Sequence, residues 1–230
     1  PALLARKEKI KNAFKEFTLN LTYDLAVYQN LFDQLDSDYY NEPPTVQKAV
    51  QTAIVNNEGK SFKAYLDNQL VELENQVSDF STAEHQVHGY FFRKQIWDFL
   101  LCSPFMARCN LKPRGFAGDS EIMRMIYLND YQGESTFSKV LHKHGLEHAA
   151  SQSVRNRISL ITRLLADFQK KERNDDSNKA SILNVACGPA FELKEIFTSS
   201  DVCHKFHFSL LDSDPKALSD STGTIESIEG

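Results

Sequence analysis

The sequence predicts an α/β fold in which a large N-terminal α-helical domain precedes the first strands of a parallel sheet. Apolar residues recur at helical spacing through most of the first 171 positions. Two short apolar runs, 182–186 and 206–211, are typical of buried strands, and a Cys187-Gly188-Pro189 turn followed by a helical pattern separates them. We therefore expect a helical domain over 1–173 and the beginning of a sheet over 174–230, joined by the polar linker 170–179.

The helical part divides into several amphipathic segments. We expect helices at 3–36, from Pro44 or Thr45 to about 57, from about 62 to 79, and from an N-cap at Thr82 to Ser103-Pro104. The first is either one long helix or two helices with a break near 18–22. Further helices are expected at 122–127, 135–147 and 151–171, whereas the pattern after Pro215 begins a helix and fades over 219–230. These segments predict a helical bundle with an aromatic core.

Composition narrows the possible classes of partner. A net charge of −5 over 230 residues argues against a nucleic-acid partner, which would require a basic face. No apolar run approaches membrane-spanning length, and the beginning lacks a signal-peptide pattern. The four cysteines show no Cys-x-x-Cys spacing, so we interpret them as free thiols. These features predict a cytoplasmic protein, and they do not predict its oligomeric state.

The order strand, glycine turn, helix, strand and acid points to a ligand. A turn of this kind lets a ligand approach backbone groups at a helix N-terminus, and Asp212 is placed to accept hydrogen bonds from both hydroxyls of a ribose. Gly188 is the single glycine of the turn, and Pro189 and Phe191 crowd the space that a diphosphate would need. An adenosine-containing ligand without phosphates is therefore favoured over a dinucleotide such as NAD, and a phosphate loop is excluded.

Two blocks carry a resemblance to a known family. Asn184, Ala186, Cys187, Gly188 and Ala190 resemble motif I of the class I S-adenosylmethionine (SAM)-dependent methyltransferases, and Leu211-Asp212-Ser213-Asp214-Pro215 resembles that family's ribose-binding motif. Asn184 stands where the family usually has an acid, and Ala186 and Ala190 replace the outer glycines. We expect these alanines to cost little because φ would remain negative.

A second block lies ahead of motif I. Pro113-Arg114-Gly115-Phe116-Ala117-Gly118-Asp119, followed by a Met-rich helix that ends in Ile126-Tyr127, resembles a block in one bacterial group of these enzymes, which includes the one for 3-hydroxypalmitate methyl ester biosynthesis. The likeness covers roughly residues 110–218. From the residues alone, the segment is either a lid over a ligand or a connector between helices, with Asp119 or Ser120 as the N-cap of the next helix.

The resemblance implies a Rossmann-like domain that binds SAM and methylates a small molecule, with the carboxylate of a fatty-acid-like substrate as a candidate acceptor. The cofactor-binding residues that it implies are Asn184, Ala186, Cys187, Gly188, Asp212 and Ser213. It implies substrate or lid roles for four others: Arg114 or Arg157 would pair with a carboxylate, Tyr127 would close over the transfer site, and Asp119 belongs to the same loop. It assigns no catalytic residue. The family's sheet usually has seven strands, so we also expect the chain to be an N-terminal fragment.

Other interpretations stay open. The chain could instead be a non-catalytic helical interaction module on a degenerate nucleotide-binding half-domain. His142, His144 and His148 lie close together in sequence, but no complete set of metal ligands accompanies them, and we expect no metal site. Arg155 and Arg157 oppose the helix dipole near the beginning of their helix, which predicts an anionic partner for them.

Overall fold

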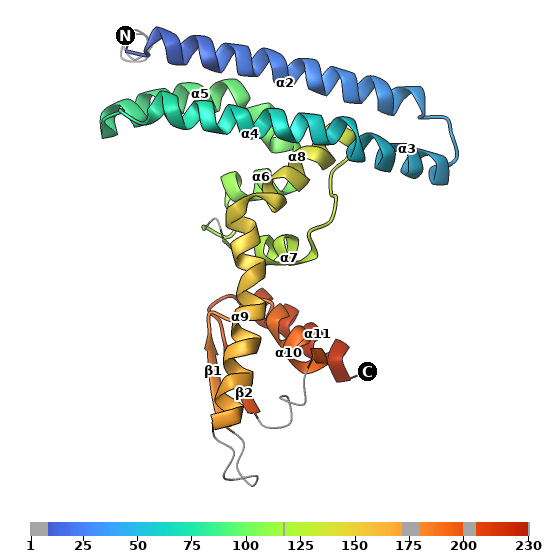
Figure 1. Ribbon diagram of the computed structural model, residues 1–230, viewed down its shortest axis with the longest axis vertical. Helices are drawn as coiled ribbons and strands as arrows, with labels where there is room; N and C mark the ends of the chain where they lie inside the picture. The colour runs from blue at the N-terminus through green and yellow to red at the C-terminus, as the bar shows by residue number, and fades with distance from the viewer. Residues whose placement is uncertain (1–8, 117, 172–179, 200–205, 230) are drawn as a thin grey trace. The chain divides into compact units, whose positions relative to one another are not determined.

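The computed structural model describes residues 9–116, 118–171, 180–199 and 206–229 (Figure 1). The chain divides into two compact units, one formed by residues 1–107 and 131–144 and the other by 108–130 and 145–230. Among the described residues, no helix is both long and apolar enough to span a membrane.

The first unit is entirely helical in its described part. It contains α2 (Asn12–Asp38), α3 (Pro44–Asn56), α4 (Glu58–Val77), α5 (Thr82–Cys102), the beginning of α6 (Pro104–Leu111) and most of α8 (Thr136–Glu147). Helix α2 packs against α4 and α5, and α3 packs against α4 (Figure 1). Helix α2 is continuous through 18–22, where the hydroxyls of Thr18 and Thr22 donate to carbonyls one turn earlier. The sequence pattern was compatible with one long helix or with two, and the structure has one continuous helix.

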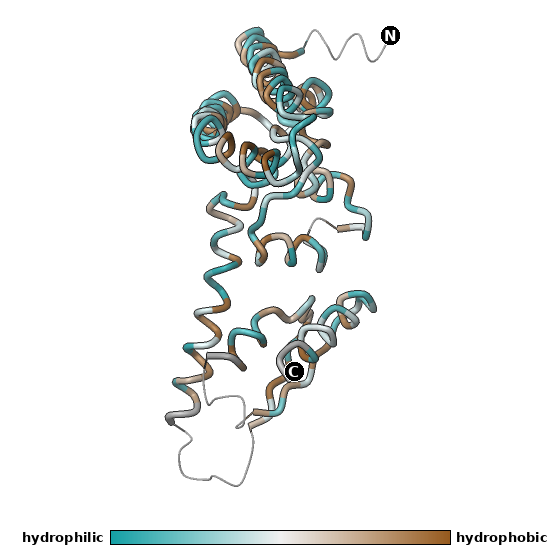
Figure 2. Tube along the Cα trace, turned by 90° about the vertical axis from the view of Figure 1, so that its right-hand side faces the viewer, coloured by the Kyte–Doolittle hydropathy of each residue, from teal (hydrophilic) through white to brown (hydrophobic). Residues whose placement is uncertain are grey.

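An aromatic core holds these helices together. Phe32, Phe62 and Phe137 come from α2, α4 and α8, are fully buried, and have ring centroids 5.4–6.4 Å apart. Figure 2 shows hydrophobic and hydrophilic segments alternating along the helices, as amphipathic helices require. The helical domain with an aromatic core is therefore confirmed.

Several helix boundaries differ from those expected. Residues 9–11 are not helical, so α2 begins at Asn12, and α4 begins at Glu58 instead of near residue 62. The N-cap of α5 is Ser81 and not Thr82: the Ser81 hydroxyl accepts a hydrogen bond from the Glu84 N–H, and the Glu84 carboxylate accepts one from the Ser81 N–H. This capping box requires an acid three residues after the cap, a spacing that Ser81 has and Thr82 lacks. Helix α5 ends before Ser103 as expected, but Pro104 then begins α6, a helix that was not expected from the sequence. Proline suits this position because the first turn of a helix needs no N–H donor there.

The second unit contains the strands. Its elements are the end of α6, α7 (Ser120–Leu128), the end of α8, α9 (Ala149–Lys171), β1 (Ala180–Val185), α10 (Phe191–Ser199), β2 (Phe206–Leu211) and α11 (Pro215–Glu229). Strands β1 and β2 pair in parallel, with Ile182 opposite Phe208 and Val185 opposite Leu211. Parallel neighbours require a crossover, which α10 provides. The chain is thus mostly helical, with a β–α–β unit as the beginning of a sheet.

The expected division between the two domains is at 173/174. That point lies within 172–179, outside the described residues. Helices α7 and α9, expected in the helical domain, belong to the compact unit that contains the strands. The reason is the apolar stripe of α9, in which Ile161 and Leu165 pack around a buried cluster centred on Leu193 and Ile196 of α10.

Helix α11 corrects the expectation that the helical pattern fades after residue 218. Polar side chains within the helix bond to its own backbone: the hydroxyls of Ser221 and Thr222 donate to the Leu218 carbonyl. Thr224 is buried and donates to the carbonyls of Pro189 and Asp220. Since hydroxyl side chains occupy part of the buried face, an apolar period was not visible in the sequence.

Candidate functional site

The turn between β1 and α10 has an unusual backbone. Positions 186, 188 and 190 all have left-handed conformations, with φ of 56° at Ala186, 56° at Gly188 and 50° at Ala190. The expectation that φ stays negative at the two alanines is therefore wrong. The chain reverses from the strand into the helix within five residues, and Ala190 N–H closes a turn onto the Cys187 carbonyl. A Cβ built on Gly188 would meet nothing within 4 Å, so this part of the turn faces open space.

Gly188 and Asp212 are in direct contact. The Gly188 N–H donates to Oδ2 of Asp212 at 2.8 Å, and the Asp214 N–H donates to Oδ1 at 2.9 Å. The Cys187 N–H donates to the Leu211 carbonyl at 3.2 Å and extends the ladder beyond the last paired residues. A carboxylate has about four acceptor positions, so Asp212 retains capacity for further donors. The N–H of Gly188 is hydrogen-bonded to Asp212 and is not available to a ligand. Because Gly188 has no side chain, a ligand could still approach its backbone closely.

Asn184 is hydrogen-bonded to an acid, Glu192, that was not among the residues predicted from the sequence. Its Nδ2 donates to Oε1 of Glu192 at 2.7 Å, and both side chains are partly buried. Glu192 lies in the first turn of α10, where the helix dipole favours a negative charge. The signal in the sequence was an acid directly after the glycine turn, four residues beyond Gly188.

The other three residues of the predicted cofactor set are sequence neighbours of Gly188 or Asp212. Ala186 and Ser213 are exposed, one at the beginning of the glycine turn and one between Asp212 and Asp214. Cys187 is buried, and burial together with the neighbouring Asp212 carboxylate raises the pKa of its thiol. A protonated thiol is a weak nucleophile. Cys187 therefore shapes the turn and offers no reactive thiolate.

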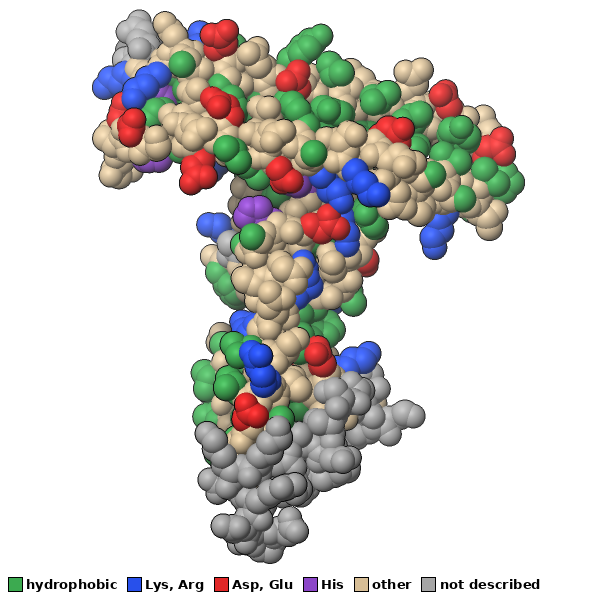
Figure 3. Space-filling model, viewed as in Figure 1, with side chains coloured by type: hydrophobic (Ala, Val, Ile, Leu, Met, Phe, Trp, Pro, Cys, Tyr) green, Lys and Arg blue, Asp and Glu red, His purple; other side chains and the backbone are tan. Residues whose placement is uncertain are grey.

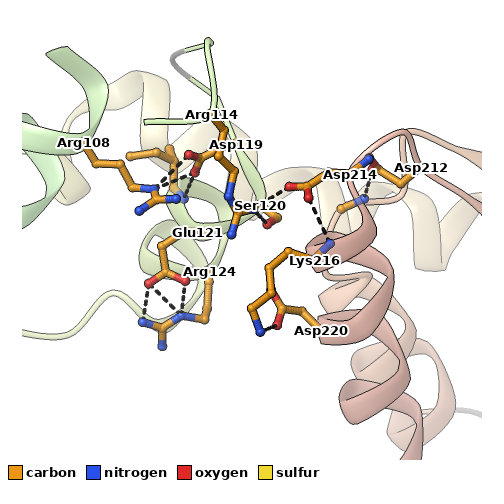
Figure 4. Close-up of polar contacts among 12 residues, drawn as sticks. Arg108, Arg114, Asp119, Ser120, Glu121, Arg124, Asp212, Asp214, Lys216 and Asp220 are labelled. Atoms are coloured by element: carbon orange, nitrogen blue, oxygen red, sulfur yellow. Dashed lines mark hydrogen bonds and ion pairs between the residues drawn. The ribbon is translucent and has the colours of Figure 1, made fainter. Parts of the chain in front are cut away.

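Arg114 reaches the end of β2 from its loop. Its Nη1 donates to Oδ2 of Asp214 at 2.5 Å and also to the hydroxyl of Ser120, as Figure 4 shows. The other oxygen of Asp214 accepts the Lys216 N–H at 2.9 Å at the beginning of α11. The loop before α7 is thus joined by an ion pair to the acidic turn after β2, and the charge of Arg114 is used in that contact.

Asp119 has a structural role at the other end of the same loop. It is the N-cap of α7, accepting the Ile122 N–H at 3.0 Å, and both its oxygens accept from Nε of Arg108 at 2.8 and 2.9 Å (Figure 4). Burial raises the pKa of Asp119, but the hydrogen bonds from Arg108 and Ile122 outweigh this effect and hold the pKa below its ordinary value. The N-cap predicted at Asp119 or Ser120 is Asp119.

Tyr127 and Arg157 form a pair beside the beginning of α10. Nη2 of Arg157 donates to the Tyr127 hydroxyl at 2.9 Å, and the Tyr127 ring lies 5.5 Å from that of Phe191, measured between centroids. Phe191 is the first residue of α10. The structure therefore brings both predicted residues to the helix that follows the glycine turn.

Arg155 bonds to neutral carbonyls and Arg157 to a neutral hydroxyl, where the sequence predicted an anionic partner. Nη1 of Arg155 donates to the carbonyls of Ile126 at 3.2 Å and Leu146 at 2.7 Å, near the ends of α7 and α8. The C-terminal carbonyls of a helix carry partial negative charge. Arg155 thus ties three helices of the second unit together.

The three neighbouring histidines have separate partners. Nδ1 of His142 accepts the Phe105 N–H at 3.2 Å, Nε2 of His144 contacts Asp67 at 2.8 Å, and Nδ1 of His148 accepts the Ala150 N–H at 3.3 Å. In the part of the chain that the structure describes, no three His, Cys, Asp or Glu side chains are grouped so that they could hold a metal ion.

Comparison with known proteins adds no relative: no family model, curated protein or solved structure matches this chain. Support for a function therefore comes from the motifs of the sequence and from the geometry of the second unit.

Proposed function

We propose that this chain binds SAM at the turn around Gly188 and belongs to a methyltransferase that acts on a small molecule. The observation that carries the proposal is the contact between the Gly188 N–H and the Asp212 carboxylate at the carboxyl ends of two neighbouring parallel strands. Ligands of open α/β sheets bind outside these ends, and an acid after the second strand is suited to ribose hydroxyls.

The residues present fit such a ligand. Positions 186, 188 and 190 have the left-handed backbone that suits glycine, and they carry the smallest side chains, so the backbone of the turn is accessible on the open side of Gly188. Asp212 has unused acceptor positions for the two hydroxyls of the ribose. Pro189 is buried against the turn, so a diphosphate has little space there.

When bound, SAM supplies a methyl group on a sulfonium, which is already activated for transfer to a nucleophile. The residues of the chain then need to align the acceptor and exclude water. Arg157 is better suited than Arg114 to bind an acceptor carboxylate. Arg114 is paired with Asp214, whereas Arg157 is exposed and bonded to a neutral hydroxyl, which leaves guanidinium donors for a bidentate contact.

Isothermal titration calorimetry with SAM tests the proposal. We expect saturable binding to the wild-type protein and at least a tenfold weaker affinity for Asp212→Ala, since charge-assisted hydrogen bonds to both ribose hydroxyls would be lost. Asp220→Ala, which removes an acid on α11 that pairs with Lys216, is the matched control and should bind normally. Undetectable heats for the folded wild type would refute SAM binding. Titration with NAD tests the dinucleotide alternative in the same way.

One observation favours the alternative of a non-catalytic interaction module. Along α2, four apolar side chains at four-residue spacing are exposed: Leu19, Tyr23, Val27 and Leu31. Hydrophobic side chains also reach the surface of this unit on the face drawn in Figure 3. A folded protein that binds neither SAM nor NAD would favour this alternative.

A further inference from the structure

We propose that Glu192, oriented by Asn184, binds the ammonium group of the amino-acid tail of SAM. This inference rests on the proposed function and assigns a ligand-contacting role to a residue outside the motifs from which that function was inferred.

Glu192 differs from the other acids discussed above, Asp119, Asp212 and Asp214, in the kind of partner it has. Asp119 is paired with Arg108, and Asp214 is paired with Arg114. Asp212 accepts two backbone N–H groups at the position suited to the ribose. Glu192, in contrast, has a neutral amide as its hydrogen-bond partner, so its negative charge is available to a cation.

The position of Glu192 matches the place where the tail would lie. It belongs to the first turn of α10, directly after the turn whose open side is at Gly188. Asp212 directly follows the other strand, at a place where it would hold the ribose, so the remainder of an adenosyl ligand would extend along the β1 side of the turn. Asn184 is the next-to-last residue of β1 and connects to Glu192 from that side.

The amide of Asn184 is well suited to this arrangement. Its Nδ2 donor occupies one oxygen of Glu192 and leaves the second oxygen as an acceptor. A carboxylate at position 184 would instead lie against the carboxylate of Glu192, and like charges at that distance repel. The acid that motif I usually has at position 184 is thus replaced by an acid eight residues later, joined to position 184 by a hydrogen bond.

Two ligands separate a tail contact from a general effect on the turn. SAM carries the ammonium group, whereas 5′-methylthioadenosine has the same adenosine and thioether without the amino-acid tail. We expect Glu192→Gln to weaken SAM about tenfold or more, because a charge-assisted hydrogen bond is lost, and to leave the affinity for methylthioadenosine unchanged. Glu195→Gln, on the exposed side of α10, is the control and should change neither affinity.

The double variant Asn184→Asp/Glu192→Gln provides an independent test. It exchanges the acid and the amide across the same contact, so one carboxylate and one amide remain. We expect the double variant to recover most of the SAM affinity that Glu192→Gln loses, whereas Asn184→Ala removes the orienting amide and should weaken SAM without affecting methylthioadenosine. Thermal unfolding without ligand identifies variants that fold, and the ratio of the two affinities in any folded variant decides the question.

The outcomes are distinguishable. Equal SAM affinity in wild type and Glu192→Gln, or equal weakening of both ligands, would overturn the role of Glu192 while SAM binding itself stands. Failure of the wild-type protein to bind either ligand would overturn the proposed function, and with it this inference.

Discussion

The backbone N–H of Gly188 and the carboxylate of Asp212 meet at 2.8 Å, although 24 residues separate them in the chain. The contact joins the turn after β1 to the turn after β2. Because the second oxygen of Asp212 accepts the Asp214 N–H, one side chain organises both turns. Asp212 should therefore influence stability as well as ligand binding.

Asp212→Ala leaves two backbone N–H groups without their acceptor, and we expect it to lower the free energy of unfolding by about 1–3 kcal/mol. Asp212→Asn keeps one carbonyl oxygen and should cost less than the alanine variant. Urea denaturation followed by circular dichroism measures both. Equal stability of wild type and Asp212→Ala would show that the contact does not organise the turns.

The left-handed alanines lead to a second prediction. Ala186 is exposed and has a positive φ, at which the clash of its Cβ costs about 1–2 kcal/mol. Ala186→Gly removes this clash, but the greater conformational freedom of glycine in the unfolded chain costs about 0.5–1 kcal/mol. We expect a net stabilisation of about 0.5 kcal/mol. Ala190→Gly gains the same relief but also loses a fully buried methyl group, which contributes about 0.8 kcal/mol. It should therefore be no more stable than wild type, and the reverse order in urea midpoints would contradict the backbone conformation.

The N-cap of α7 predicts a pH dependence. The pKa of Asp119 is below its ordinary value in the folded protein, so its stabilisation is fully present above about pH 4 and is lost as the pH falls through the folded pKa. Asp119→Ala should cost about 1 kcal/mol at neutral pH. The difference between wild type and variant should shrink below pH 4. A difference that stays constant as the solution is acidified would assign the effect to packing instead of charge.

The ion pair between Arg114 and Asp214 should contribute a coupling free energy of about 1 kcal/mol, since it is partly shielded from solvent. A double-mutant cycle with Arg114→Gln and Asp214→Asn measures this coupling, and it should decrease as salt is added. Arg163→Gln on the exposed side of α9 is the matched control. Strict additivity of the two substitutions at low salt would mean that the pair does not hold the loop.

The aromatic core of the first unit can be tested separately. Phe137 is fully buried and contacts Phe62, so Phe137→Ala should lower the free energy of unfolding by about 3–5 kcal/mol. Tyr90→Ala, at a side chain that is 65% exposed, should have little effect. Trp97 on α5 is the single tryptophan and reports this unit by fluorescence. A small effect of Phe137→Ala would contradict the packing of α8 against α4.

The elements themselves were largely readable in the sequence. Helical periodicity identified α2 to α5 and α7 to α9, and the short apolar runs on either side of Gly188 identified both strands. These features are local, because the spacing of the apolar residues within each helix or strand indicates which of its faces is buried. The meeting of Gly188 with Asp212 was also predictable, since acids and turns that follow parallel strands lie at the same edge of a sheet.

Tertiary structure decided which charged side chains form ion pairs or hydrogen bonds, and with which partners. Arg114 and Asp214 are 100 residues apart, and they become partners because α7 packs on α9 and α9 packs on α10 in the same compact unit. Asn184 and Glu192 are only eight residues apart, but their hydrogen bond forms because the left-handed turn brings the beginning of α10 back to the end of β1. The sequence by itself determined the helices, the strands and the ligand-type turn, because these follow from neighbouring residues. The tertiary structure decided the backbone angles of the alanines, the division into units and the pairing of the acids, because these depend on groups that are distant in the chain.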